Sequence, residues 1–559
     1  MKAQARQRAV GQGSRRPAGI LGTMVVSVCA GLLLAACSSS GNSPAATPPP
    51  TGANAHTLQL AFTEDTQPLD PDVYYAGQGL VATTSMYEGL VQYAPETLSY
   101  TGNLGYQAVT SKPAIVPDLA TSWTISPNGL SYTFDLRHGV TFHDGTPFTS
   151  AAVSADITRR EAVNGGPAYQ EAMVASVQTP DPYTVVINLK QPTNAFMDYL
   201  ASAYGLKMIS PALLAAHAGN DQAQSYLQTH DGGTGPYTMT KAQPGVEYQL
   251  SYFPGYWGAK PYYTTIDIRI IPNISTQEIE FEDGQLSLLL QGLNTQAIQQ
   301  FRSDKTDHVY EVPTLETPAL WVNPHTPVFS TQTARDDLND AIDRSALVDD
   351  VYPGRAVVAS QIYPSGEVPA GSAVDDQGYD PSKLQKFLQG YHGSTSVILG
   401  YDTADPADEP LADLLQTELA SDGLNVTVKG YTDTVLYGFP NNLTGAPDLI
   451  IDSNWPDAAG PDTWARIVMY STGTMGGLNY FQCKVSQGDS SLDQSNSDTN
   501  AAQALTLDEQ AGAAYAASGC WDTIAYRGDT VVAPSWMGGI VHQVPVPETV
   551  VLADLHPNS

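Results

Sequence analysis

Four cysteines carry the most distinctive side-chain chemistry of this chain, and Cys37 follows Leu34-Ala35-Ala36 at the end of an apolar run. Residues 1–17, before that run, hold five basic residues and no acid. A basic start, an apolar stretch and a small-residue cleavage site predict a secretory signal, which we assign to residues 1–36. A cysteine directly after such a site is typical of a bacterial lipobox, so we expect Cys37 to carry lipid. The alternative is an uncleaved anchor, because the run approaches the ~20 residues that span a bilayer.

Cys29 lies inside the expected signal, which leaves Cys483 and Cys520 for the exported chain. Exported proteins meet oxidising conditions, so these two remaining cysteines predict one disulfide. Two free thiols or half of a metal site are the alternatives, and no Cys-x-x-Cys pair supports the metal.

Other motifs do not combine into a catalytic or cofactor site. Gly77-x-Gly79-x-x-Ala82 has the spacing of a phosphate-binding loop, but no clear core strand precedes it. His138 and His143 lie five residues apart across a turn, without a His-x-x-x-His pair elsewhere. No G-x-S-x-G nucleophile motif occurs. We therefore expect no catalytic residue, no metal and no cofactor.

Any binding site needs strands and helices to position it. The sequence patterns that predict strands and helices alternate along the chain. Folded structure should begin at Leu58, where LQLAF alternates as a strand does. Further strands are expected at 132–136, 184–189, 266–271, 396–399 and 448–451, and helices at 196–203, 334–347 and 411–419. This alternation predicts an α/β architecture.

Two polar segments stand apart from that pattern. Residues 37–56 are small and proline-rich, which predicts a disordered tether. Residues 484–505 are polar and rich in turn formers, which predicts a long surface loop or a mobile insertion.

Composition limits the partners of the chain. Its 559 residues include 57 acids against 25 Lys and Arg, with a net charge of −32. Such a surface repels phosphate backbones, and no basic stripe occurs, so we expect no nucleic-acid partner. With 42% hydrophobic residues and a length beyond one common domain, the chain should fold as more than one lobe.

One segment is specific enough to indicate a family. Residues 117–148 read PDLATSWTISPNGLSYTFDLRHGVTFHDGTPF, with tight turns at Asn128-Gly129 and Asp144-Gly145. This segment closely resembles the signature of the extracytoplasmic solute-binding proteins of peptide ABC importers, the dipeptide-, oligopeptide- and nickel-binding family. Further segments resemble the family in the family's order, at 63–71, 86–91 (its first helix), 233–237, 255–258, 334–344 and 379–381. The resemblance covers nearly all of residues 57–559.

The resemblance implies a two-lobed, periplasmic-binding-protein-like α/β fold with a hinged ligand cleft and an extra subdomain in the first lobe. We expect lobe I at 57–315, lobe II at 316–531 and a C-terminal return to lobe I at 532–559. The chain would cross between the lobes near Thr317-Pro318 and near residues 532–534.

The resemblance also implies the ligand-binding residues. Asn454-Trp455-Pro456-Asp457 resembles the loop whose aspartate pairs with the ligand's ammonium group in peptide-binding members, although Asp457 follows the tryptophan one residue early. A carboxylate in a closed cleft can form a strong charge-assisted bond to an amine. Thr63, Glu64 and Asp65 stand where the family's first strand ends at the cleft, and Tyr237 could form part of its wall. For Asp457 the alternative is an aspartate that only forms a turn. For Thr63, Glu64 and Asp65 it is a set of polar residues that face solvent, and for Tyr237 it is packing in the core.

The implied function is that of a non-enzymatic substrate-binding lipoprotein. It would bind an oligopeptide or another small solute, deliver it to ABC permease subunits, and work as a monomer at the extracytoplasmic face of the cell membrane. A lipid-anchored extracellular hydrolase and a peptide-sensing receptor that does not transport are the alternatives.

Overall fold

Residues 48–66, 68–100, 102, 105–369, 378–471, 477–544 and 550–558 are described by the structure, which is a computed structural model. The expected signal peptide, Cys37 and the tether up to residue 47 lie outside these residues. In the rest of the expected tether, a short 3₁₀ helix, η1 (Gly52–Asn54), precedes the first strand. The described residues all belong to one compact unit, Ala46–Ser559.

The first sheet has the strand order β1-β11-β10-β9. Its strands are β1 (Thr57–Phe62), β9 (Tyr237–Gln243), β10 (Glu247–Tyr252) and β11 (Thr265–Ile270). β1 runs parallel to β11, with Leu58 opposite Ile266. The alternation that predicted the first strand is confirmed, because Leu58 and Leu60 are buried in the core of this part.

A second sheet, with the order β5-β6-β8-β7, forms the core of the expected subdomain. Its strands are β5 (Ala120–Ile125), β6 (Ser131–Leu136), β7 (Val174–Asp181) and β8 (Thr184–Leu189). Gly129 has a φ of 68° in the turn between β5 and β6, a conformation that glycine adopts without strain. The predicted hairpin is therefore present. Phe134 and Val185 pack with Val153 of helix α2 (Ser150–Val163).

The third sheet has seven strands and holds the second part of the chain together. Its order is β13-β18-β12-β16-β14-β15, with β17 paired to β12. The strands are β12 (Asp307–Val322), β13 (Ala356–Val358), β14 (Ser396–Asp402), β15 (Asn425–Tyr431), β16 (Leu449–Asn454), β17 (Trp521–Thr523) and β18 (Ala525–Pro534). β14 is parallel to both β15 and β16, so the carboxyl ends of these three strands share one edge.

Helices surround these sheets, and short strand pairs close the remaining edges. The helices not yet named are α1 (Leu80–Met86), α3 (Phe196–Ala201), α4 (Pro211–His217), α5 (Gln224–Leu227), α6 (Ile274–Glu282), α7 (Thr295–Ser303), α8 (Gln332–Asn339), α9 (Arg344–Val351), α10 (Pro381–Gly390), α11 (Asp408–Ser421), α12 (Asp433–Leu436), α13 (Pro461–Val468), α14 (Ser486–Ser497), α15 (Ala501–Ala516), and the 3₁₀ helices η2 (Gly166–Glu171), η3 (Pro327–Phe329) and η4 (Leu552–Asp554). The short pairs are β2 (Val91–Tyr93) with β4 (Ile115–Pro117), β3 (Glu96–Thr97) with β20 (Val541–His542), and β19 (Met537–Gly538) with β21 (His556–Pro557).

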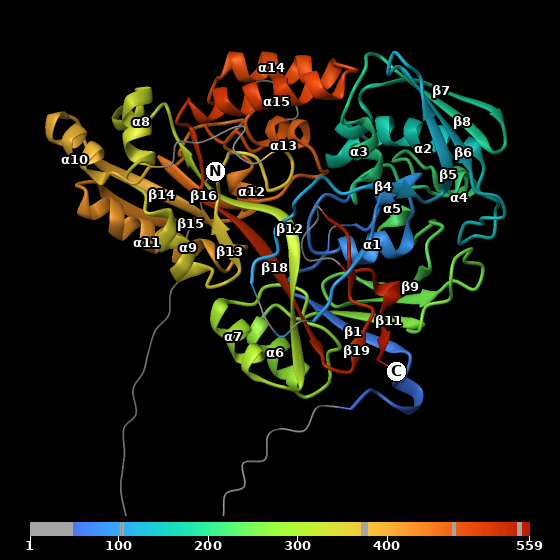
Figure 1. The fold of residues 1–559 in the computed structure, drawn as a ribbon. Coiled ribbons are helices and arrows are strands. Elements are labelled where there is room, and N and C mark those ends of the chain that lie inside the picture. The colour runs from blue at the N-terminus through green and yellow to red at the C-terminus, as the bar shows by residue number, and fades with distance from the viewer. Residues whose placement is uncertain are drawn as a thin grey trace, which may run out of the picture. The chain divides into compact units, whose positions relative to one another are not determined.

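Two long strands connect the parts. β12 and β18 run side by side (Figure 1), with Val309 opposite Val532 and Glu311 opposite Thr530. Tyr310 of β12 and Val531 of β18 are buried in the core of the first sheet, whereas Leu320 and Ala525 of the same strands are buried against the third. Within these two strands the chain therefore passes twice between the part built on the first sheet and the part built on the third sheet.

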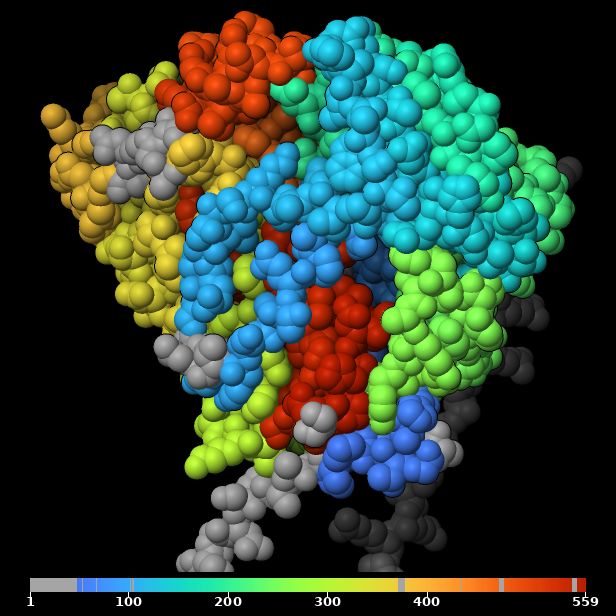
Figure 2. All heavy atoms as spheres, turned by 45° about the vertical axis from the view of Figure 1, so that its right-hand side comes forward, coloured from blue at the N-terminus to red at the C-terminus, as the bar shows by residue number. Residues whose placement is uncertain are grey.

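A third connection is made by residues 94–100 and 105–114, which are light blue on the face shown in Figure 2. The backbone N–H of Leu98 donates to the carbonyl of Ile540, and that of Tyr106 donates to the carbonyl of Gly354. The Ser365 hydroxyl donates to the carbonyl of Val109 over 2.9 Å. The segment thus contacts both parts of the protein.

The segment at 233–237 shows why glycine is needed there. A Cβ atom on Gly233 would lie 2.0 Å from the carbonyl oxygen of Met86, at the end of α1. The N–H of Gly235 donates to the same oxygen over 2.9 Å. Any side chain at 233 would break this contact, so the glycine is required for backbone packing.

Three sequence predictions of local structure were wrong. Residues 86–91 do not form a helix, because α1 ends at Met86 and strand β2 begins at Val91. The stretch 334–347 is two helices, since Asp343 caps the second one by accepting from the N–H of Ala346. The polar segment 484–505 contains all of α14 and the start of α15. It is helical because Gly488 and Leu492 of α14 pack in the core beside Tyr515 of α15, a tertiary contact that composition does not reveal.

Candidate functional site

A hollow of about 360 Å³ lies between the first and the third sheet, at the carboxyl ends of their parallel strands. Thr63 and Glu64, directly after β1, line one side. Asp402, which ends β14, and Trp455, which follows β16, line the other. Open α/β sheets bind ligands in this position, outside the carboxyl ends of their strands.

Arg527 is the most strongly bonded side chain of this hollow. Its Nε donates to Glu316 Oε2 over 3.0 Å, its Nη2 donates to Glu316 Oε1, and its Nη1 lies 2.6 Å from Asp405 Oδ2. Glu316 belongs to β12 and Asp405 follows β14, so the guanidinium joins three segments. Burial raises the pKa of Glu316 to about 7, against the opposing effect of Arg527. Burial disfavours the charge of Arg527, but Asp405 and Glu316 outweigh it and raise its pKa.

The lining of the hollow is predominantly acidic. Six carboxylates face two guanidinium groups, Arg355 and Arg527; the acids are Glu64, Glu316, Asp350, Asp402, Asp405 and Asp529. Gln78 fixes the rim near β1, since its Nε2 donates to Thr63 Oγ1 and its Oε1 accepts from the N–H of Glu64. Such a lining favours a solute that carries positive charge.

Of the six ligand residues predicted from the sequence, the hollow brings together Thr63, Glu64 and Trp455. Asp65 does not line it, and its carboxylate accepts from the Tyr248 hydroxyl over 2.7 Å. Tyr237 is fully buried in the core of the first sheet and donates to the carbonyl of Tyr263. The packing alternative therefore fits the position of Tyr237.

Asp457 lies outside the lining of the hollow, in a contact between two parts of the chain. Its Oδ2 accepts hydrogen bonds from the hydroxyls of Tyr75 and Tyr169, and Ser202 Oγ donates to its backbone carbonyl over 2.6 Å. Asp457 is only 7% exposed. Burial raises the pKa of Asp457 to about 6, although the two tyrosine bonds oppose that shift. In the structure, this carboxylate thus joins the loop after β16 to the segment before α1 and to η2.

A further contact joins the subdomain to helix α14, and the two lie close together in Figure 1. The N–H of Asn194 donates to the carbonyl of Asn496, and its Nδ2 donates to the carbonyls of Ser495 and Asp498. Carbonyls at a helix end have no partner inside the helix, so Asn194 satisfies groups that would otherwise need water.

Cys483 and Cys520 are paired in the structure, with an S–S distance of 2.01 Å. Both are buried in the core around Tyr480 and Trp521. The pair joins the segment before α14 to the residue before β17.

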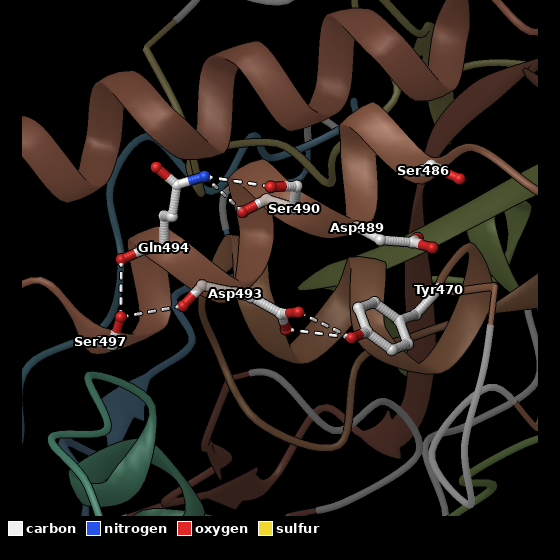
Figure 3. A pocket seen from close by; sticks show the side chains of 7 residues that line it. All are labelled: Tyr470, Ser486, Asp489, Ser490, Asp493, Gln494 and Ser497. Carbon is white, nitrogen blue, oxygen red and sulfur yellow. Dashed lines mark hydrogen bonds between the residues drawn. The ribbon is translucent and has the colours of Figure 1, made fainter.

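A shallow depression along α14, drawn in Figure 3, is a weaker candidate for a binding site. Asp493 at its centre accepts from the Tyr470 hydroxyl and from Arg466 Nη1. Gln494 donates to the carbonyl and the hydroxyl of Ser490. Its polar groups, from α14 and from the end of α13, satisfy one another, so we assign it no ligand.

Several residues that line the hollow were not predicted from the sequence. Glu316 and Arg527 come from strands 211 residues apart, and only the pairing of β12 with β18 brings them together. Asp402 and Asp405 follow a predicted strand, and the rule that ligands bind at strand ends could have identified them. Within the described part of the chain, no three His, Cys, Asp or Glu side chains are grouped to hold a metal ion.

A match to a family model identifies the family of this chain. The model of the bacterial extracellular solute-binding proteins, family 5 (middle), matches residues 114–476. The chain belongs to this family. It is thus an extracytoplasmic solute-binding protein of the ABC-importer type, for peptides or similar ligands, as the resemblance predicted. Its relatives are binding proteins of transporters, not enzymes. In the described residues, no helix is both long and apolar enough to cross a membrane.

Curated members of the family align over much of the chain. The protein named "Probable D,D-dipeptide-binding periplasmic protein DdpA" from Escherichia coli K12 is 26% identical over 407 residues, which is 72% of this chain and 75% of that protein. The glutathione-binding protein GsiB of Escherichia coli O1:K1 is 29% identical over 363 residues, 63% of this chain and 69% of that protein.

Solved structures confirm the two-lobed fold. The periplasmic binding protein DppA from Helicobacter pylori, in complex with the peptide STSA, superposes with a TM-score of 0.76 at 21% identity, over 90% of this chain and 98% of that one. NikA from Brucella suis with Fe(III)-EDTA gives a TM-score of 0.76 at 21% identity, over 90% of this chain and 100% of that one. A dipeptide-binding protein from Pseudoalteromonas with Met-Leu gives 0.77 at 19%, again over 90% and 100%.

Proposed function

We propose that this family member captures a peptide or a similar small solute in the hollow between its lobes and delivers it to an ABC permease. The observation that carries this proposal is the acidic hollow at the carboxyl ends of parallel strands from two separate sheets. Its volume of about 360 Å³ lies within the range of small-molecule sites, roughly 300–1,000 Å³.

Lobe closure is part of the proposal. Lobe I would comprise 57–315 with the return at 532–559, lobe II would comprise 316–531, and β12 and β18 would bend between them. The Asp457–tyrosine and Asn194–α14 contacts join the two proposed lobes, which supports a closed arrangement. Thr63, Glu64 and Trp455 would contact the ligand from opposite sides of the hollow.

Native mass spectrometry of the protein as purified tests the proposed function. We expect a co-purified species whose mass fits a short peptide or a comparable solute, released intact on denaturation. A purified protein that cleaves a mixture of synthetic peptides would instead support the hydrolase alternative.

Replacing Asp457 by asparagine should lower the affinity for a peptide with a free amino group by about ten- to a hundred-fold, if a charged hydrogen bond is lost. Asp457 lies outside the lining of the hollow and is bonded to Tyr75 and Tyr169, so this contact requires the ammonium to reach past the hollow and take the place of a tyrosine hydroxyl on the carboxylate. Because burial has already raised the pKa of Asp457 to about 6, a neutral amide should hardly change the melting temperature without ligand. Calorimetric titration with the peptide found by mass spectrometry measures the change.

The same carboxylate predicts a pH dependence. Ammonium binding needs the ionised form, so affinity should fall as the pH drops through about 6 in the unaltered protein and stay flat in Asp457→Asn. The exposed Asp135 offers a charge-matched control, Asp135→Asn, which should behave like the unaltered protein. Equal affinities in all three proteins would mean that Asp457 serves only the contact with Tyr75 and Tyr169.

Membrane attachment through Cys37 and a monomeric state complete the proposal. Cys37→Ala should shift the protein from the membrane to the soluble fraction or leave it unprocessed, since stable anchoring needs two or more acyl chains on that residue. Membrane fractionation followed by immunoblotting measures this. If the variant and the unaltered protein both stay with the membrane after processing, the lipid site lies elsewhere.

A further inference from the structure

The subdomain contributes nothing to the wall of the hollow. In the described part of the chain, no residue between 79 and 290 lines it. The subdomain lies entirely within that range, since its sheet and helices α2 and α3 run from Ala120 to Ala201. Phe134 of β6 and Phe196 of α3 share its core. A solute in the hollow therefore does not touch the subdomain, whose role lies elsewhere.

The subdomain instead contacts the last turn of α14, which belongs to the proposed lobe II. The N–H of Asn194 donates to the carbonyl of Asn496 over 2.8 Å. Its Nδ2 donates to the carbonyls of Ser495 and Asp498 over 2.7 and 2.8 Å. In return, Asn496 Oδ1 accepts from the N–H of Ala195 over 3.3 Å. These hydrogen bonds join one end of a lobe II helix to the residues directly before α3.

The same interface has a buried apolar centre. Ala195 and Tyr199 of the subdomain pack with Ala458, which lies in the loop after β16, and all three are buried. Tyr169 and Met173 pack against this cluster from the subdomain side. The other apolar members of the cluster thus all belong to the subdomain, so separation of the two lobes would expose Ala458 to water.

The turn between β5 and β6 reaches the same side of lobe II. A Cβ atom on Gly129 would lie 3.2 Å from Cγ2 of Thr499, in the loop between α14 and α15. The tip of this hairpin therefore packs against lobe II. The segment 117–148, whose sequence indicated the family, contributes to this interface and not to the lining of the hollow.

Helix α14 itself is held within lobe II. Leu492 is buried in one core with Tyr515 of α15, and a Cβ atom on Gly488 would lie 2.8 Å from that ring. The disulfide between Cys483 and Cys520 holds the chain just before the helix. α14 therefore moves with lobe II, whereas the residues that bond to its last turn move with the subdomain.

We propose that the subdomain is a closing arm, which docks on the end of α14 and on the loop after β16 and holds the two lobes together without touching the solute. The inference rests on the lobe division of the proposed function. Contacts made only in the closed arrangement stabilise that arrangement by their own free energy. Because the arm touches no solute, it should strengthen the retention of every solute equally and leave the choice between solutes to the hollow.

Amide hydrogen exchange tests the arm on the purified full-length protein, dialysed free of small molecules. Asn194→Asp removes the side-chain donor and places a carboxylate at a helix end, where the carbonyl dipoles repel negative charge. We expect the backbone amides of residues 194 and 195 to exchange about ten- to a hundred-fold faster in this variant. Gln494→Ala is the matched control, because the Gln494 side chain donates to Ser490 within the same helix. It should keep the protection of the unaltered protein.

A second variant separates a docking surface from a permanent core. Ala458→Arg places a long cation in the buried cluster, and in a permanent core this change would unfold the protein or lower its melting temperature strongly. On a docking surface it only keeps the arm away. We therefore expect the melting temperature to fall by a few degrees at most, while the radius of gyration, measured by small-angle X-ray scattering, rises as the lobes separate.

Two results would overturn the closing arm. Equal exchange at residues 194 and 195 in Asn194→Asp and in the unaltered protein would show that these bonds do not hold the lobes together. An Ala458→Arg variant that unfolds, or that keeps the radius of gyration of the unaltered protein, would show that this cluster is not a docking surface. Neither measurement uses a solute, so failure of the arm leaves solute capture in place, and a failure to capture any solute leaves both readouts of the arm intact.

Discussion

Replacing Arg160 by methionine should destabilise the folded protein by about 3–5 kcal/mol, the cost of breaking a buried ion pair from one side. Arg160 is 0% exposed and lies on α2. Its guanidinium donates to the carboxylates of Asp72 and Glu171 and to the carbonyls of Pro71, Tyr204 and Gly205. Methionine fills much of the volume but leaves these acceptors buried without a donor. Urea denaturation followed by tryptophan fluorescence measures the loss.

The pH dependence of this loss follows from Glu171. Burial raises the pKa of Glu171 to about 7, although Arg160 opposes the shift. Without the arginine the folded-state pKa rises further above the unfolded value. A carboxyl group with a raised pKa loses stability as the pH increases, so the deficit of the variant should be smaller at pH 5 than at pH 8.

Lys383→Met provides the control, because the exposed Lys383 pairs with Asp340 at the surface and exposed pairs contribute little to stability. If Arg160→Met loses no more stability than this control, the network around Asp72 contributes specificity of packing but little free energy.

The same network shows what the sequence could predict. The segment 63–71 resembled the opening of the family, and the structure makes Asp70 of this segment and Asp72 directly after it partners of Arg159 and Arg160. Arg160 and Asp72 are 88 residues apart, and nothing in local spacing links them. The strands predicted at β6, β8, β11, β14 and β16 are all present. In β6 and β8 the alternation follows directly from which face is buried, whereas β16 is buried along its whole length.

The predicted residues that line the hollow each follow a single strand, whereas the lining residues that depend on two segments meeting were not foreseen. Thr63, Glu64 and Trp455 follow strands, and the hollow includes them. Arg355 and Arg527 line it only because β13 and β18 are neighbours in the sheet. Asp457 was predicted from a loop motif, and the sequence could not reveal that Tyr75 and Tyr169 occupy its carboxylate.

Replacing Cys483 and Cys520 together by serine should lower the free energy of unfolding by roughly 3–4 kcal/mol. The pair closes a loop with a sequence separation of 37 residues, and the cross-link limits the freedom of that loop in the unfolded chain. The loop contains the serine-rich α14, which buries few apolar side chains of its own. Local opening should therefore be most evident there, as faster amide exchange in α14 than in α11, which packs in a different core.

Peptide mapping without reducing agent checks the premise, and the two cysteines should appear in one linked peptide pair. The single variant Cys483→Ser should lose as much stability as the double variant, since either change removes the cross-link. Reduction of the unaltered protein should bring it to the same stability as the variants. Two freely alkylated thiols in the unaltered protein, or a double variant as stable as the unaltered protein, would show that packing of α14 on α15 alone holds this region.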